Sequence, residues 1–364
     1  MTGHNTPTGV ALAPSLPPVA CPPRGPISAP ITIIGDFPSS AECRAGHLFT
    51  TSGILASLLK EAHIDPTTCH YLNVFNFRVP QFEIAELCAS KAEVGGSSYH
   101  YPALATGQYL RPEFFPLLDD FWSHVDQLQS NTFVALGNTA SWALLGQTGI
   151  SKIRGAISEA VTPEGKHIKV LPTFHPGSII KTWNQRPIAV FDLMKARRES
   201  LFPEVRRPFR EVKVLETVAD IEEMEADLAD AEMLSVDIET KGEIITCLGF
   251  APTTELAYVV PLFNTSPAEM YWKTEREEIL IWQMIQRLLA SPTPKVMQNG
   301  MYDIQYLWRH GCAVKNFTHD TMICHHVLQP ELPKGLGFLG SIYANEASWK
   351  LMRRRGQHTL KKDE

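Results

Sequence analysis

Four short apolar runs recur along the first half of this chain, and they restrict its possible folds more than any other feature. These runs are Ile31–Ile34, Tyr71–Phe75, Thr132–Leu136 and Ile168–Leu171. Glycine turns and segments with helical spacing separate them, which predicts buried strands alternating with helices. Such alternation is typical of a mainly parallel sheet sandwiched between layers of helices.

Polar residues fall where these predicted strands end. Asp36 follows the first run, Asn73 lies near the end of the second, and His175 follows the fourth. Because ligands of parallel α/β sheets bind outside the carboxyl ends of the strands, we expect a site at this edge.

The length of 364 residues predicts two domains at roughly 100–200 residues per domain. Residues 1–30 hold eight of the 27 prolines and one charged side chain, Arg24. Proline-rich segments with few charges do not build a core, so we expect a disordered leader there. The expected division is leader 1–30, first domain 31–200, charged linker 201–212, second domain 213–350 and basic tail 351–364.

Composition excludes several classes of protein. No apolar stretch approaches the roughly 20 residues that a membrane-spanning helix needs. Seven scattered cysteines do not suggest a secreted disulfide scaffold, so we expect a reducing cytoplasm. The net charge of −6 lies entirely after residue 200, and neither half is basic. Any DNA binding therefore requires local patches or metal ions that bridge carboxylates to phosphates.

The second half predicts a mixed α/β domain. Its predicted elements are a helix over Val218–Ala231, strands over Met233–Ile238, Ile244–Phe250, Leu256–Pro261 and Lys295–Met297, and an amphipathic helix over Glu275–Ala290.

Short motifs in the first domain occur in a family order. Gly35-Asp-Phe-Pro38 is followed by Gly46-His-Leu-Phe49, Leu72-Asn73, Leu136-Gly-Asn-Thr139 and Phe174-His-Pro-Gly177. Together, over Ile31–Arg198, they resemble the uracil-DNA glycosylase superfamily, most nearly its prokaryotic branch. The resemblance implies an α/β/α sandwich that accepts a flipped base.

The resemblance also implies roles for individual residues. Phe49 stacks on the base, and Asn73 pairs with its Watson–Crick edge. Gly35, in the first of these motifs, is also a base-binding residue. His175, held rigid by Pro176, donates a hydrogen bond to the departing base anion. Asp36 positions water and stabilises the cationic sugar.

Two departures from the family pattern concern the first domain. The family has glutamate where this chain has Asp36, which is one methylene shorter. Related enzymes often hold an iron–sulfur cluster on four cysteines, but Phe77 stands at one of those positions and Cys21 has no C-x-x-C partner. Because such a cluster needs four placed thiolates, we expect none here.

Acidic residues define a second constellation. Asp237 and Glu239 lie two apart on a predicted strand, so both carboxylates share one face. Adjacent carboxylates repel unless a divalent cation neutralises them. Asp303 comes 64 residues after Glu239 in the segment Gln298-Asn299-Gly-Met-Tyr-Asp303. Asp320 follows, and we interpret it as a helix cap.

This spacing resembles the 3′–5′ exonuclease domain of family A DNA polymerases, a ribonuclease-H-like fold, over about Val212–Trp349. Its motifs D-x-E and N-x-x-x-D match Asp237, Glu239, Asn299 and Asp303. The resemblance implies two Mg²⁺ or Mn²⁺ ions held by Asp237, Glu239 and Asp303, with Asp237 bridging both. It also implies that Asn299 belongs to the DNA-contacting motif.

The family's third motif, Y-x-x-x-D, has no counterpart, since Tyr343 is followed by Glu346 three residues later. The chain ends about where that motif should begin. We therefore expect a natural short form, a split gene product or a fragment of a phage-type or bacterial polymerase. A separately encoded polymerase domain would be its partner in a bacterial or phage-infected cell.

Together these features predict a DNA-processing protein that acts on single strands or 3′ ends. One alternative is a catalytically inactive DNA-binding scaffold of a replication complex. Another is a nucleotide-binding α/β enzyme, but Gly35-Asp-Phe-Pro38 makes a poor phosphate loop because proline and phenylalanine crowd the backbone.

Overall fold

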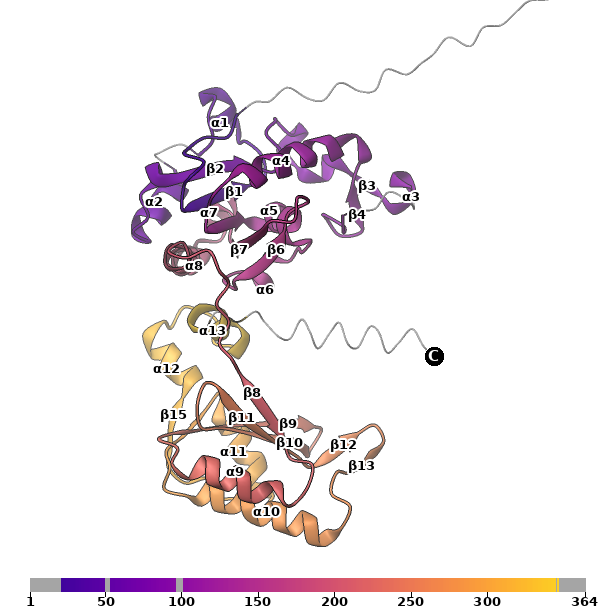
Figure 1. The fold of residues 1–364 in the computed structure, drawn as a ribbon, viewed down its shortest axis with the longest axis vertical. Helices are drawn as coiled ribbons and strands as arrows, with labels where there is room; N and C mark the ends of the chain where they lie inside the picture. The colour runs from indigo at the N-terminus through magenta and orange to yellow at the C-terminus, as the bar shows by residue number, and fades with distance from the viewer. Residues whose placement is uncertain (1–20, 50–52, 96–100, 345, 347–364) are drawn as a thin grey trace, which may run out of the picture. The chain divides into compact units, whose positions relative to one another are not determined.

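The computed structural model describes residues 21–49, 53–95, 101–344 and 346. The chain divides into two compact units. Unit 1 takes the residues up to Val205 together with those from Gly337 onward, and unit 2 takes Arg206–Leu336. Each unit has its own sheet (Figure 1).

Unit 1 is built on a five-stranded sheet of order β2-β1-β5-β7-β6. Its strands are β1 (Ile31–Gly35), β2 (Cys69–Asn73), β5 (Thr132–Leu136), β6 (Ser158–Val161) and β7 (His167–Thr173). The first four in spatial order run parallel and β6 runs antiparallel to β7. The ends of β1, β2 and β7 that carry the candidate residues therefore share one edge of the sheet.

Helices cover both faces of this sheet. Every residue of β1, β2 and β5 is buried, as expected for parallel strands between two helix layers. Unit 1 also has a small sheet of β3 (Cys88–Ser90) and β4 (Gln108–Leu110). Its helices are α1 (Ser40–Ala45), α2 (Ile54–Glu61), α3 (Lys91–Val94), α4 (Phe115–Gln127), α5 (Gly137–Leu145), α6 (Ile150–Ile153), α7 (Pro176–Lys181), α8 (Arg186–Glu199) and α13 (Leu336–Tyr343).

The described part of the predicted leader is folded against unit 1, which corrects the expectation of disorder over residues 21–30. Cys21 and Ala29 are buried, and Arg24 forms an antiparallel bridge with Tyr71 of β2. Strand β2 is the edge of its sheet, so this segment pairs with backbone groups that the edge would otherwise expose. Residues 1–20 of the leader lie outside the described residues.

Unit 2 contains a six-stranded mixed sheet of order β15-β14-β9-β10-β11-β8. Strands β9, β10 and β11 form an antiparallel meander, while β14 and β15 run parallel to β9, and β8 runs parallel to β11. Its elements are β8 (Glu211–Val214), α9 (Asp220–Ala229), β9 (Leu234–Lys241), β10 (Ile244–Ala251), β11 (Leu256–Pro261), β12 (Phe263–Thr265), β13 (Ala268–Met270), α10 (Glu275–Ala290), β14 (Lys295–Met297), α11 (Gly300–Arg309), β15 (Phe317–Asp320) and α12 (Thr321–Leu328).

The predicted fold class is confirmed: unit 1 is an α/β unit with a mainly parallel sheet, and unit 2 has the mixed sheet of a ribonuclease-H-like fold. Helices α9 and α10 contact each other in unit 2 (Figure 1). Among the described residues, no helix combines the length and apolarity required to cross a bilayer.

One boundary differs from the predicted division, because strand β8 begins at Glu211, inside the predicted linker 201–212. At the far end, the described residues from Gly337 onward pack in unit 1. Arg154 donates a hydrogen bond to the Ser341 hydroxyl (3.0 Å), and Lys195 donates to the Ser341 carbonyl. These buried contacts attach α13 to unit 1. The predicted basic tail 351–364 lies outside the described residues.

Candidate active sites

The first candidate site is a cavity of about 240 Å³ at the carboxyl edge of the unit 1 sheet. It is lined among others by Phe37, Phe49, Asn73, His175, Pro176 and Ile180. Gly35 and Asn73 are direct partners in the parallel register of β1 and β2. A Cβ on Gly35 would lie 2.5 Å from Asn73 Oδ1 and 2.9 Å from Phe49 Cζ, so only glycine allows this close approach.

His175 and Asp36 face each other beside this cavity. His175 Nε2 lies 3.2 Å from Asp36 Oδ1. The Gly177 N–H donates to His175 Nδ1 at 3.1 Å, so the proton of a neutral ring must reside on Nε2, facing Asp36. Pro176 opens helix α7 directly after His175, and its ring restricts the backbone there.

Each partner shifts the titration of the other. Burial acts to raise the pKa of Asp36, but the charge of His175 and its hydrogen bond outweigh burial, and the pKa is lowered. Burial acts to lower the pKa of His175, but the charge of Asp36 outweighs it, and the pKa is raised. The Asp36 carboxylate therefore stabilises a proton on Nε2 of His175, while the Gly177 N–H that donates to Nδ1 opposes a second proton on the ring.

Asn73, which lines the cavity, has an unsatisfied buried polar group. Its side chain is only 2% exposed, and its Nδ2 has no hydrogen-bond partner among the described residues. Leaving a buried donor unpaired costs about 1–3 kcal/mol. Functional sites are the usual place for such a cost, because a ligand can supply the missing acceptor.

Phe49 is held in an uncommon conformation. Its φ of 43° lies in the left-handed region, which costs a residue with a Cβ on the order of 1–3 kcal/mol. Its N–H donates to Glu42 Oε1 at 2.6 Å, and its ring centroid lies 5.5 Å from that of Tyr71. Glu42 was missed from the sequence, although Ser39-x-x-Glu42 has the pattern of a capping box, which the structure contains.

Two exposed apolar side chains near His175 were also missed. Ile180 of α7 is 68% exposed and lines the cavity, and Trp183 directly after this helix is 63% exposed. Exposed large apolar side chains beside a cavity are a common feature of binding surfaces. Their position soon after His175-Pro176 was the available signal.

The second candidate site lies in unit 2. Asp237 and Glu239 alternate with buried residues along β9 and lie on its exposed face, as predicted. Asp303 in the first turn of α11 is 4% exposed, and its Oδ1 accepts a hydrogen bond of 3.0 Å from the Ile238 N–H. The structure thus brings Asp303 to the strand between Asp237 and Glu239.

The charges at this second site repel. Burial and, less strongly, Glu239 raise the pKa of Asp237. Burial raises the pKa of Asp303 to about 6, and Asp237 and Asp320 act in the same direction. A nearby cation would relieve the repulsion and keep the carboxylates ionised.

Asp320 organises the turn before α11. Its carboxylate accepts from the Asn299 N–H (3.1 Å) and the Gly300 N–H (2.8 Å), and it also caps α12 through the Met322 N–H (2.8 Å). This agrees with the interpretation of Asp320 as a helix cap. Asn299 adopts a left-handed φ of 58° at the start of α11, and its contact with DNA stays a prediction.

Tyr302 is a neighbour of the acidic cluster that the sequence did not single out. Its hydroxyl lies 2.7 Å from the Thr240 hydroxyl, directly after Glu239, and its ring centroid is 4.9 Å from that of Tyr306. Tyr343 lies in α13 of unit 1. Residues 347–364 lie outside the described residues.

The donor chemistry differs between the two implied metal groups. Three carboxylates suit Mg²⁺ or Mn²⁺, which prefer oxygen ligands. Within the described ranges, however, no three His, Cys, Asp or Glu side chains are gathered tightly enough to hold a metal ion, so this site is not preassembled.

The cysteines of unit 1 do not fit an iron–sulfur cluster. Cys43, Cys69 and Cys88 donate their thiols to the backbone carbonyls of Pro38, Asp65 and Ile84. Burial raises the pKa of Cys21 and of Cys69 to about 11, which opposes the thiolate form that ligation needs.

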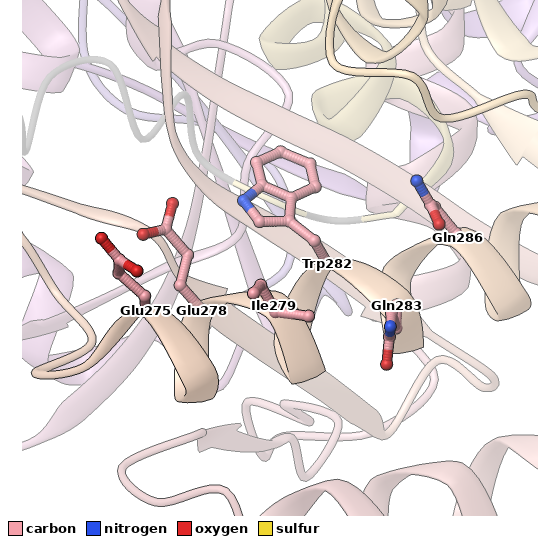
Figure 2. Close-up of a pocket in the computed structure, with 6 residues that line it drawn as sticks. All are labelled: Glu275, Glu278, Ile279, Trp282, Gln283 and Gln286. Carbon is pink, nitrogen blue, oxygen red and sulfur yellow. The ribbon is translucent and has the colours of Figure 1, made fainter.

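Another pocket, of about 430 Å³, lies on α10 (Figure 2). Its lining side chains, which include Glu275, Ile279 and Trp282, are spaced three and four apart and occupy one side of the helix. None of the candidate site residues lines it.

Comparison with protein families finds a uracil DNA glycosylase superfamily domain at residues 22–199 and a 3′-5′ exonuclease domain at residues 212–351. The chain therefore joins two kinds of domain that process nucleic acids. The predicted order of the two domains is confirmed. No curated protein matches the chain.

Solved structures with similar folds include three nuclease domains. The Aedes aegypti Nibbler EXO domain is 15% identical with a TM-score of 0.29, over 40% of this chain and 74% of that one. The EXD2 exonuclease domain soaked in Mg and dGMP is 18% identical with a TM-score of 0.26, over 38% and 72%. Trypanosoma brucei RNase D in complex with RNA U12 is 14% identical with a TM-score of 0.32, over 40% and 51%.

Proposed function

We propose that unit 2 removes nucleotides from the 3′ end of DNA in a reaction that requires divalent metal ions. The observation that carries this proposal is the hydrogen bond from the Ile238 N–H to Asp303, which fixes a buried carboxylate against β9 at the residue that separates Asp237 from Glu239 in sequence. Like charges held together in this way are stabilised by cations, and a phosphodiester brings further negative charge that the same cations bind.

The residues that would hold Mg²⁺ or Mn²⁺ are Asp237, Glu239 and Asp303. Ions bound there supply a water-derived nucleophile and stabilise the leaving oxygen of the phosphodiester. The Ile238 N–H fixes the orientation of Asp303, and Asp320 fixes the turn from which Asp303 projects. The exposed ring of Tyr302 offers a surface on which a terminal base can stack.

Unit 1 supports a second function, recognition of a uracil-type base and cleavage of its N-glycosidic bond. The specific observation that favours it is the unpaired, buried Asn73 Nδ2 in a cavity that also presents Phe49 and His175. A base oxygen would satisfy Asn73, and the ring of Phe49 would contact the base face. Ile180 and Trp183 would occupy the space that the flipped base leaves in the strand.

The chemistry of this step follows from the His175–Asp36 pair. The departing base takes both electrons of the glycosidic bond, and His175 Nε2–H donates a hydrogen bond to the base oxygen that gains the charge. Asp36, released from His175, orients a water molecule toward C1′ and accepts its proton. The Asp36 carboxylate beside Nε2 of His175 keeps the proton on that nitrogen before the substrate arrives.

A combined role in proofreading follows from the two sites. The chain would inspect bases in single-stranded DNA and trim 3′ ends for a polymerase domain encoded elsewhere, in the cytoplasm of a bacterial or phage-infected cell. The competing function is a catalytically inactive DNA-binding scaffold of a replication complex.

The exonuclease is tested with a 3′-labelled single strand and Mn²⁺. We expect release of the terminal nucleotide by the full chain, and loss of this release with Asp237→Ala or a chelator. Asp230→Ala, which removes an exposed carboxylate at the end of α9, is the matched control and retains activity. Equal activity of the Asp237→Ala and Asp230→Ala variants would overturn the assignment.

Base release is tested with a strand that contains one uracil, followed by alkaline cleavage of the abasic product. We expect cleavage by the wild type and its loss with His175→Ala. The control is His167→Ala, which removes an exposed histidine from β7 of the same unit. Binding of DNA without activity in either assay would favour the scaffold.

A further inference from the structure

Arg24 is the one charged residue among the first 30, and neither proposed reaction uses it. Its backbone pairs with Tyr71 in both directions, with N–H to O distances of 3.0 and 2.7 Å. Gly25 allows this close approach because a Cβ there would lie 2.2 Å from the Cys69 carbonyl oxygen. The position of Arg24 on the edge of β2 is thus fixed by the backbone.

The guanidinium of Arg24 extends from this edge toward the base cavity. Its carbon Cζ lies 4.6 Å from the ring centroid of Tyr71, and its Nη2 donates a hydrogen bond to the backbone carbonyl of Phe49. Tyr71 is itself anchored, since its hydroxyl donates to the Pro66 carbonyl at 2.8 Å. A cation stacked on an aromatic ring and bonded to a carbonyl is restricted in two independent ways.

Phe49 is consequently held from three directions. Glu42 accepts from its N–H, Arg24 donates to its carbonyl, and Tyr71 contacts its ring. Both backbone groups of a strained residue are bonded to charged side chains, so the conformation with φ of 43° persists although it is costly. The ring of Phe49 forms part of the cavity wall next to Gly35 and Asn73.

We propose that Arg24 is a positioning residue for the base cavity: it holds Phe49 in the conformation that contacts a flipped base. This inference rests on the proposed base recognition by unit 1. Arg24 touches neither His175 nor Asp36 by any described hydrogen bond or ion pair, so it acts on binding of the base and leaves the bond-breaking step unchanged.

The experiment measures two properties of the full chain. The first is the dissociation constant for a single strand with one uracil, compared with the same strand containing thymine, together with KM and kcat for base release. The second is hydrogen–deuterium exchange of the peptide over residues 42–49, which contains the Phe49 amide.

We expect Arg24→Ala to raise the dissociation constant and KM for the uracil strand about tenfold, with kcat changed less than about twofold. Exchange over residues 42–49 should become faster. Arg24→Lys keeps a cation but loses the planar guanidinium that stacks on Tyr71, so it should show a smaller loss of binding than Arg24→Ala and slower exchange over residues 42–49. Arg44→Ala removes an exposed arginine from α1 and should behave as the wild type.

The experiment distinguishes failure of the proposed base recognition from failure of the inference about Arg24. A wild-type chain without preference for uracil would refute the proposed base recognition, while faster exchange in Arg24→Ala would still support control of Phe49 by Arg24. Unchanged exchange over residues 42–49 in Arg24→Ala would overturn the inference whatever the activity. Arg24→Met, which retains the apolar stem, replaces Arg24→Ala if the latter does not fold, and the same outcomes apply.

Discussion

The cavity of unit 1 and the acidic cluster of unit 2 handle charge in opposite ways. In unit 1, Asp36 faces His175, and each stabilises the ionised form of the other. In unit 2, Asp303 and Asp237 are both acids, and burial and repulsion raise the pKa of each. The first site is balanced within the protein, whereas the second carries an excess of negative charge.

This difference indicates how each site is completed. A balanced pair can be preformed, and the cavity of unit 1 already has its wall, its unpaired amide and its ion pair in place. Carboxylates that repel one another do not close around an empty centre, which agrees with the lack of a preassembled three-ligand cluster among the described residues. Under the proposed functions, unit 1 would need only its ligand, whereas unit 2 would need cations first.

The largest expected effect is on the exonuclease. Glu239→Gln should reduce release of 3′-labelled nucleotide about 10³-fold, because loss of metal-assisted stabilisation is worth several kcal/mol. Glu243→Gln changes an exposed acid four residues further along and serves as the control. Base release from the uracil strand should be unchanged in both variants, and a parallel loss there would show that the two sites are not independent.

The next effect concerns the balanced pair. Asp36→Asn should slow base release about 10²-fold, the lower range for loss of a positioned acid or base. Without the charge of Asp36, burial should lower the pKa of His175 below 6.5, whereas in the wild type it is raised above that value. Titration of the His175 ring by NMR measures this change. An unchanged pKa of His175 would contradict the assigned ion pair.

Metal binding should change stability in one unit only. Mn²⁺ at about 100 times its dissociation constant should add about 2.7 kcal/mol to the unfolding free energy of unit 2. Thermal unfolding of the wild type and of Asp303→Ala measures this, and the variant should lose most of the gain. His175→Gln in unit 1 serves as the control and should retain it.

The smallest expected effect is the pH dependence of the metal-free protein. The folded-state pKa of Asp303, about 6, lies above its usual 3.8. The contribution of this carboxyl to the free energy of unfolding is therefore fully present below pH 3.8, and it is lost as the pH rises through 6. Between pH 4 and pH 7, the free energy of unfolding of the wild type should therefore fall by on the order of 2 kcal/mol relative to that of Asp303→Asn. Chemical denaturation at several pH values measures the difference. A constant difference would show that the carboxyl of Asp303 is not buried.

Much of the second site was predictable because its geometry is local. Alternation along β9 places Asp237 and Glu239 on one face, and N-x-x-x-D places Asp303 one turn into a helix. The bounds of Glu275–Ala290 and Lys295–Met297 also agree with the predicted elements. The family resemblance implied that Asp303 joins Asp237 and Glu239, but its hydrogen bond with the Ile238 N–H was not predicted and required the packed sheet.

The contacts that no local pattern predicted join distant parts of the chain. Arg24 reaches Phe49 and Tyr71, and Arg154 reaches Ser341 across 187 positions. The segment 21–30 was predicted to be disordered because composition gives no information about a sheet edge available for pairing. Glu42 also makes a contact that no local pattern predicted. Its capping role in α1 was detectable from the sequence, but the hydrogen bond it accepts from Phe49 depends on the folded path of the chain between the two residues.

By itself the sequence determined the strand and helix periods, the strand-end positions of Asp36, Asn73 and His175, and the shared face of Asp237 and Glu239. These properties follow from backbone repeats of two and 3.6 residues, which neighbouring residues set. Only the tertiary structure decided which charges are compensated, which amide is left unpaired and which segment holds Phe49. Burial and electrostatic shifts depend on atoms brought together from far apart in the chain, and no local repeat encodes that proximity.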